Sequence, residues 1–189
     1  MKTEIVRLSQ IHLNQANPRT ITDDKLVSLV NSILVLPKML ELRPIVVDDT
    51  YTALGGNMRC RALLSISDML VEEMEDRLGS LRDFKKKTDA ERASLMAYWG
   101  RWLDYPTAEV VKASMLSDSE KQEFIIKDNV GFGTWDQDAL TENWDKEDLA
   151  DWGMDNWALE AKEESEEKEK EGKVKELICP HCGENVYES

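Results

Sequence analysis

The stretch Leu54–Leu64 constrains the fold of this chain most, because it places a strand end, a double-glycine turn and a helix in direct succession. The run Tyr51–Leu54 is typical of a strand, and an alanine- and leucine-bearing segment follows Gly55-Gly56 directly. Two glycines at such a turn let the backbone approach a ligand closely, since no Cβ stands in the way. The unpaired N–H groups at the start of the helix, together with Arg59 and Arg61, favour an anion such as a phosphate group. An ordinary β-turn before a helix with two surface arginines explains the same pattern equally well.

The negative charge of the chain lies in its second part. Residues 1–112 contain 16 Lys and Arg against 16 Asp and Glu, whereas residues 113–189 contain 8 against 22 and so carry the whole formal net charge of −14. Phosphate contacts along a duplex require a basic face, so direct DNA binding is not expected of this chain. A small basic pocket in the neutral part is compatible with this balance, and the acidic part suits a basic protein partner.

Length and apolar content describe the class of protein. The 189 residues suffice for one domain of ordinary size with a tail, and 41% hydrophobic residues allow a real core. Apolar runs are short, and Met1–Gln10 lacks the pattern of a signal peptide. Three cysteines fit a reducing compartment better than a disulfide scaffold. These features predict a cytoplasmic protein without a membrane partner.

The hydrophobic periodicity predicts an α+β fold, with a small mixed β-sheet flanked by helices and a helical, acidic C-terminal part. Thr22, Thr88 and Ser117 each have the sequence context of a helix N-cap. A long helix is expected from Arg61 to about Leu81, with a break at Gly79. The expected strands are Glu4–Leu8, Pro44–Val47, Tyr51–Leu54 and Ala108–Ala113, the middle two joined as a hairpin through Asp48–Thr50.

Three motifs follow one another along the first third of the chain: Asn17-Pro18-Arg19, Arg43–Val47 and Gly55–Ala62. This succession, within residues 2–62 and with a later piece near Asp128, resembles the ParB N-terminal/sulfiredoxin-like domain family. The resemblance implies a nucleotide-binding domain over residues 1–130, with a helical insertion near residues 63–104. It also implies that Arg19 and the turn hold the phosphates of a nucleotide, which is CTP in ParB and ATP in sulfiredoxin and free-serine kinases. The implied turn residues are Gly55, Gly56, Asn57, Arg59 and Arg61.

The pair Asp128-Asn129 follows an expected helix. ParB relatives carry a Glu-Asn pair at this place, where it helps to hold the metal that accompanies the triphosphate. The resemblance therefore implies Mg²⁺ as a cofactor, with Asn129 as a metal ligand and Asp128 as the catalytic residue. An Asx-type helix terminus without any ligand explains the same two residues.

The chain also departs from the family pattern at the turn itself. Sulfiredoxins carry a cysteine directly after the two glycines, whereas Asn57 stands here and Cys60 lies three residues further on. We expect Cys60 to be packed in the helix rather than reactive, so sulfinate repair is not expected. ParB proteins have an acidic residue followed by arginine where this chain has Asn57-Met58.

Residues 131–159 form a short extension with two similar units, Trp135–Leu140 and Trp144–Leu149, nine residues apart. In each unit an aspartate after the tryptophan can cap a short helix whose leucine returns to that tryptophan. A similar tail accompanies ParB-like domains of phages and mobile elements, which implies such an origin and, for a phage protein, the host cell cytoplasm. Two capped helical turns anchored by core tryptophans explain the pattern without a ligand.

The last two segments differ sharply in composition. Residues 160–176 are a Glu- and Lys-rich linker, and residues 177–189 form a tail that resembles a zinc knuckle. The thiolates of Cys179 and Cys182 have the spacing to share one Zn²⁺ ion, but a closed structural site has four ligands. Such a site closes only through a second copy in a homodimer or through another protein. The alternative is an exposed tail without metal.

Together, the motifs and the resemblance favour a ParB-like protein that binds CTP or ATP with Mg²⁺. Such a protein is a candidate nucleoside triphosphatase of phage or plasmid DNA metabolism. No helix-turn-helix with a basic recognition helix follows the domain, so sequence-specific DNA recognition is not expected. Two alternatives stay open: a ParB-like DNA nuclease, and a non-catalytic interaction protein that keeps the fold.

Overall fold

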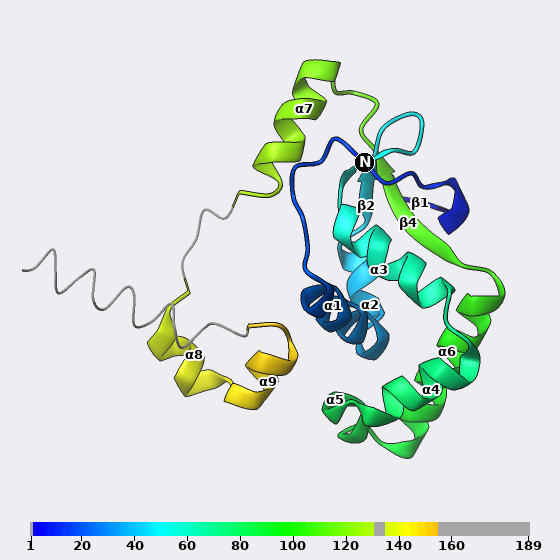
Figure 1. Cartoon of the computed structure of the whole chain (residues 1–189), viewed down its shortest axis with the longest axis vertical. Helices are drawn as coiled ribbons and strands as arrows, with labels where there is room; N and C mark the ends of the chain where they lie inside the picture. The colour runs from blue at the N-terminus through cyan, green and yellow to red at the C-terminus, as the bar shows by residue number, and fades with distance from the viewer. Residues whose placement is uncertain (1, 131–134, 155–189) are drawn as a thin grey trace, which may run out of the picture. The chain divides into compact units, whose positions relative to one another are not determined.

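The computed structural model of the protein describes residues 2–130 and 135–154 (Figure 1). The chain divides into two compact units, Met1–Thr134 and Trp135–Ser189. The expected linker at 160–176 and the tail with Cys179 and Cys182 lie outside the described residues. None of the described helices has the length and apolar character that crossing a membrane requires.

A four-stranded mixed sheet organises the first unit, with the strand order β1-β4-β2-β3. Strand β4 runs parallel to β2 and antiparallel to β1, while β2 and β3 form an antiparallel hairpin. The strands are β1 (Glu4–Arg7), β2 (Ile45–Val47), β3 (Ala53–Gly55) and β4 (Thr107–Lys112). This arrangement confirms the predicted α+β class and the predicted hairpin.

The turn of this hairpin is held by one carboxylate. Asp48 Oδ1 accepts hydrogen bonds from the backbone N–H groups of Thr50, at 2.8 Å, and Thr52, at 2.9 Å. Tyr51 adopts a positive φ of 61°, which is uncommon for a residue other than glycine. Its carbonyl accepts from the N–H of His12 at 2.9 Å. The hairpin is therefore tied to the segment that leads from β1 to the first long helix.

Helices occupy most of the remaining described chain in the first unit, and their starts agree with the predicted caps. Thr22 accepts a hydrogen bond from the N–H of Lys25, and Thr88 and Ser117 each form the two bonds of a capping box. The helices are α1 (Asp23–Val35), α2 (Lys38–Leu42), α3 (Asn57–Ser67), α4 (Val71–Ser80), α5 (Arg82–Lys85), α6 (Asp89–Asp104) and α7 (Asp118–Lys127), with the 3-10 turn η1 (Leu8–Gln10) after β1.

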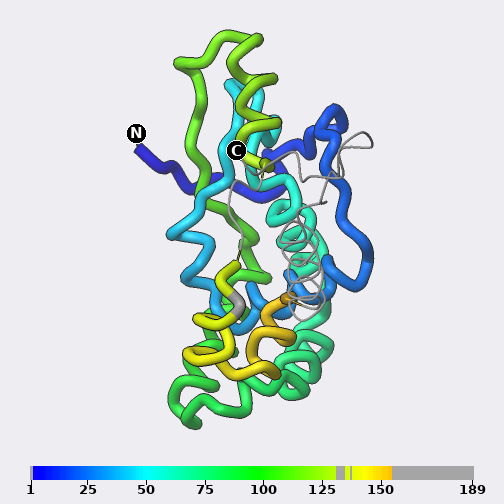
Figure 2. Tube along the Cα trace, turned by 90° about the vertical axis from the view of Figure 1, so that its left-hand side faces the viewer, coloured from blue at the N-terminus to red at the C-terminus, as the bar shows by residue number. Residues whose placement is uncertain are grey.

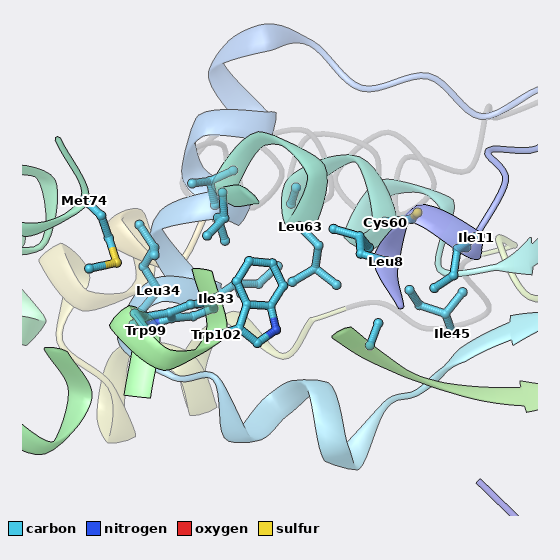
Figure 3. Packing of buried hydrophobic residues seen from close by; sticks show 14 of the residues in the cluster. Leu8, Ile11, Ile33, Leu34, Ile45, Cys60, Leu63, Met74, Trp99 and Trp102 are labelled. Carbon is cyan, nitrogen blue, oxygen red and sulfur yellow. The ribbon is translucent and has the colours of Figure 1, made fainter. Parts of the chain in front are cut away.

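Helix α3 connects the sheet to the helical part of the core. It contacts β2, β3, η1 and α1, and its buried side chains are Cys60, Ala62, Leu63 and Ile66. Figure 3 shows Leu63 among the buried side chains that these elements contribute, between Ile45 on one side and Ile33 on the other. Trp99 of α6 is fully buried in the same cluster, and its indole N–H donates to the carbonyl of Leu34 at 2.8 Å.

The long helix expected from Arg61 to Leu81 is a wrong prediction, because two helices occupy this stretch. Helix α3 already begins at Asn57 and ends at Ser67, and α4 begins at Val71. At the end of α3 the Ser67 hydroxyl donates to the carbonyl of Leu64 at 2.8 Å, and the N–H of the C-cap residue Asp68 donates to the carbonyls of Ile66 and Leu64. Leu70 then takes an extended conformation and stays 71% exposed, while Gly79 lies within α4 rather than at a break.

The described part of the second unit, residues 135–154, contains two short helices, α8 (Gln137–Asn143) and α9 (Lys146–Asp151). Both begin as predicted: Asp136 Oδ1 accepts from the N–H of Ala139 at 3.0 Å, and Asp145 Oδ1 accepts from the N–H of Glu147 at 2.9 Å. Gly153 ends α9 with a positive φ of 97°, which is the left-handed conformation expected after a helix C-cap.

The burial of Trp99 gives a first testable prediction. Trp99→Ala should lower the free energy of unfolding by about 3–5 kcal/mol, because a large buried side chain is lost and a cavity is left. Leu42→Ala is the matched control: this side chain is 82% exposed, so its removal should change stability by about 0.5 kcal/mol or less. Urea unfolding followed by circular dichroism measures both. A loss below about 1 kcal/mol at Trp99 would contradict the packing described.

Candidate functional site

The turn from β3 into α3 exposes the start of a helix without a side-chain cap. Gly56 is the N-cap residue, with a left-handed φ of 85°, and its carbonyl accepts the first helical hydrogen bond from Cys60 at 3.0 Å. The N–H groups of Asn57, Met58 and Arg59 precede that bond and so have no partner within the helix, and the N-cap residue offers no side-chain acceptor. Such a helix start carries partial positive charge and points its donors outward.

The side chain of Arg59 folds back over this turn. Its Nη2 lies 2.9 Å, and its Cζ 3.3 Å, from the position that a Cβ on Gly56 would occupy. A larger residue at position 56 would therefore meet the guanidinium as well as an unfavourable φ. Arg59 Nη1 is buried and has no hydrogen-bond partner among the described residues. A buried charged donor without a partner is costly, so an anion would be stabilised at this atom.

Two further charges act on Arg59. Burial lowers its pKa from the ordinary value, the positive charge of Arg43 lowers it further, and the negative charge of Asp128 opposes both. The guanidinium groups of Arg59 and Arg43 thus repel each other near this turn, and that of Arg59 is also poorly hydrated because it is partly buried. An anion would relieve both the repulsion and the loss of hydration, because it stabilises the charged form of each arginine.

Helix α7 brings Asp128 to the other glycine of the turn. Figures 1 and 2 show α7 beside the β2–β3 hairpin, and α7 contacts β3 directly. Asp128 Oδ2 lies 2.9 Å, and Phe124 Cε1 3.2 Å, from the position of a Cβ on Gly55. A side chain is therefore excluded at the two positions by different neighbours. At Gly55 it would meet the end of α7, and at Gly56 it would meet the Arg59 side chain.

Asn129 joins α7 to the segment before α1. Its Oδ1 accepts a hydrogen bond from Arg19 Nη1 at 2.8 Å, and its Nδ2 donates to the carbonyl of Ile125 at 2.6 Å. The second bond is the helix-terminus contact that explains Asn129 without a ligand. The first one links two of the residues that the resemblance assigned to the nucleotide site, although they are far apart in sequence.

The remaining predicted site residues behave differently from one another. Asn57 Oδ1 accepts from the N–H of Asn14 at 3.1 Å, so this side chain holds a loop while its own N–H stays at the helix start. Arg61 lies two residues after Arg59, about 200° further around α3, so the two side chains leave the helix on different sides. The structure therefore does not bring Arg61 to the turn.

Cys60 is fully buried beneath the turn, as predicted. Burial raises the pKa of its thiol to about 11, so it is protonated and inert near neutral pH. In residues 2–130 and 135–154, no three His, Cys, Asp or Glu side chains converge as a metal cluster. Asp128 and Asn129 place a carboxylate and an amide oxygen at the end of α7.

Sequence reasoning missed two residues of this site. Asn14 orients Asn57, and Arg43 adds positive charge beside Arg59. A signal existed only for Arg43, which lies two residues before β2 and therefore close to the strand that ends at the glycines. Nothing in the sequence around Asn14 indicates its contact with a residue 43 positions later.

The chain matches no protein-family model, no curated protein and no solved structure. The resemblance to the ParB N-terminal/sulfiredoxin-like family therefore stays a prediction.

The geometry of the turn predicts opposite effects for two glycine substitutions. Gly56→Ala should destabilise the protein by about 1–3 kcal/mol, because the left-handed φ and the close Arg59 side chain both oppose a Cβ. Gly79→Ala is the matched control in α4, where a Cβ meets no atom within 4 Å; it should stabilise the protein by about 0.5–1 kcal/mol. Thermal or urea unfolding measures both. Equal effects of the two substitutions would show that the turn is not as described.

Proposed function

We propose that this protein binds a nucleoside triphosphate, CTP or ATP, with its phosphates at the start of α3. The observation that carries the proposal is the buried, unpartnered Nη1 of Arg59 beside an uncapped helix start. A phosphate group there accepts from the backbone N–H groups of Asn57 and Met58 and from the Arg59 guanidinium. These are the donors with which helix starts and arginines bind phosphates in general.

The surrounding charges favour a polyphosphate over a single small anion. Arg43 lies close enough to influence Arg59, and Arg19 lies at the end of α7 through its bond to Asn129. These three arginines come from separate segments around one turn, so successive phosphates of one ligand have a cation each. Gly55 and Gly56 keep the backbone accessible to such a ligand.

The residues present fit a magnesium ion in part. Mg²⁺ is usually held by one or two protein oxygens together with phosphate oxygens and water, and Asp128 and Asn129 offer a carboxylate and an amide oxygen. The amide oxygen of Asn129 already accepts from Arg19, so metal binding requires it to share or exchange that contact. Mg²⁺ would offset the charge of the phosphates here, and Asp128 is the residue proposed for any hydrolysis.

A role in the DNA metabolism of a phage or plasmid is part of the same proposal and rests on the family resemblance alone. The nuclease alternative gains no support, since the described residues hold no converging cluster of metal ligands. The interaction-protein alternative makes a different prediction: the fold is kept and no nucleotide binds.

The proposal is tested by replacing Arg59. Loss of a charged hydrogen bond to phosphate costs about 1.5–3 kcal/mol, so Arg59→Ala should weaken a micromolar ligand by about tenfold to a hundredfold while the fold persists. Arg61→Ala on the far side of α3 is the matched control and should change the affinity by about threefold at most. Isothermal titration with CTP, ATP, GTP and UTP, with and without magnesium, gives the affinities. If none of the four binds the wild-type protein saturably, the interaction-protein alternative takes its place.

The role of Asn129 is tested separately. If its amide oxygen holds Mg²⁺, Asn129→Ala should weaken nucleotide binding only when magnesium is present. If it acts by orienting Arg19, the loss should be equal with and without the metal, and the assignment of Asn129 as a metal ligand would be wrong. Arg19→Ala serves as the reference for the second outcome. Titrations of both variants with the preferred nucleotide distinguish the two cases.

A further inference from the structure

We propose that residues 135–154, here called the tryptophan unit, form a docking surface for a basic amphipathic segment of a partner protein. In this interface the apolar side chains of the partner pack on Trp135 and Trp144, and its cations face the acidic side chains of the unit. The proposal concerns the second unit of the chain and does not depend on nucleotide binding.

Trp135 and Trp144 of the tryptophan unit are exposed to solvent. In both helices the aspartate N-cap is preceded by a tryptophan and followed, four positions later, by a leucine. Leu140 and Leu149 are buried, at 4% and 3% exposure, whereas Trp135 is 58% and Trp144 47% exposed. The two leucines are thus buried, whereas about half of each indole is exposed and available for another contact.

In the first unit, by contrast, the described tryptophans are buried. Trp99 and Trp102, the described tryptophans of that unit, are buried, and their indole N–H groups donate to the carbonyls of Leu34 and Thr107. The expectation that the tryptophans of the extension are core anchors is therefore wrong for Trp135 and Trp144. Exposed tryptophans in a small, well-capped unit are typical of binding sites, because tryptophan is among the residues that contribute most to interfaces.

The tryptophans are held at defined places rather than on a loose chain. Trp135 precedes α8, Trp144 joins α8 to α9, and Trp152, which is 50% exposed, follows α9. Helices of 7 and 6 residues are each about 10 Å long, so neighbouring tryptophans stand about one short helix apart. Asp136 and Asp145 cap the starts of α8 and α9, and Gly153 terminates α9. These fixed helix boundaries lower the entropic cost of binding.

Charge identifies the chemistry of the occupant. Residues 135–154 contain seven Asp and Glu against a single Lys, a net charge of −6 on a short segment. Such a surface repels nucleic acid and anionic lipid, and it attracts a segment rich in lysine and arginine. Apolar anchors surrounded by negative charge fit a basic amphipathic helix, which offers apolar side chains on one face and cations on the other.

The test uses the full chain and three fluorescein-labelled peptides of about 18 residues. The first has leucine at helical i, i+3, i+4, i+7 spacing and lysine elsewhere; the second replaces leucine by serine, and the third replaces lysine by glutamate. Fluorescence anisotropy near physiological salt measures the affinities. The wild-type protein should bind the leucine–lysine peptide at least about tenfold more tightly than the serine–lysine peptide, and the glutamate peptide not at all.

Two variants separate the contributions of the indoles and of the charge. Trp135→Ala/Trp144→Ala, which keeps both aspartate caps, should remove the tenfold preference for leucine. Glu142→Lys/Asp151→Lys changes two exposed side chains without touching a tryptophan or a cap, and should weaken both lysine peptides. Leu42→Ala and Leu70→Ala are matched controls at exposed apolar side chains of the first unit and should change nothing.

Three results would overturn the proposal. The first is equal binding of the leucine and serine peptides, which reduces the effect to general charge attraction. The second is an unchanged preference in the double tryptophan variant while circular dichroism shows it folded; if that variant unfolds, the Glu142→Lys/Asp151→Lys variant and the peptide pair decide instead. The third is a dimer in sedimentation velocity that the tryptophan substitutions dissociate, because a second copy of the chain is then the occupant.

Discussion

The left-handed conformation of Gly56 determines where α3 begins, and the centre of the first unit depends on that start. Gly56 alone can adopt the left-handed turn and leave room for the arginine, so β3 passes into α3 without a connecting loop. Because α3 starts there, Cys60 and Leu63 face the sheet and α1, which builds the core. The Arg59 side chain lies against this turn, and its Nη1 is buried without a hydrogen-bond partner among the described residues, so the turn that starts α3 is also the candidate anion site.

The sequence correctly predicted those helix starts and turns that depend on interactions between neighbouring residues. The caps at Thr22, Thr88 and Ser117 and the hairpin around Asp48 depend on neighbouring residues, and all are present. The break between α3 and α4 was missed, because the apolar pattern continues through the connection between Ser67 and Val71. Periodicity indicates which face of a helix is apolar and carries no information about where the backbone leaves the helix.

The residues of the candidate site also fall into those that local sequence predicts and those that only the fold brings together. The glycine turn and Arg59 follow from sequence, since they are adjacent on one strand–helix connection. The contacts of Asn14 with Asn57, and of Arg19 with Asn129, join residues 43 and 110 positions apart, so only the fold brings them together. The two units also have separate chemistry: the first gathers arginines at a helix start, and the second shows indoles among carboxylates. We therefore propose a polyphosphate ligand for the first surface and a basic protein partner for the second.

The central claim is that the start of α3 holds phosphates, and a nucleotide titration followed by backbone amide NMR tests it most directly. CTP or ATP, added with magnesium to the full chain, should shift the amide signals of Asn57, Met58 and Arg59 saturably, because their N–H groups become donors to phosphate. Residues 135–154 should not respond, since their surface is acidic. An absence of saturable shifts at residues 56–60, or shifts confined to other parts of the chain, would contradict the account.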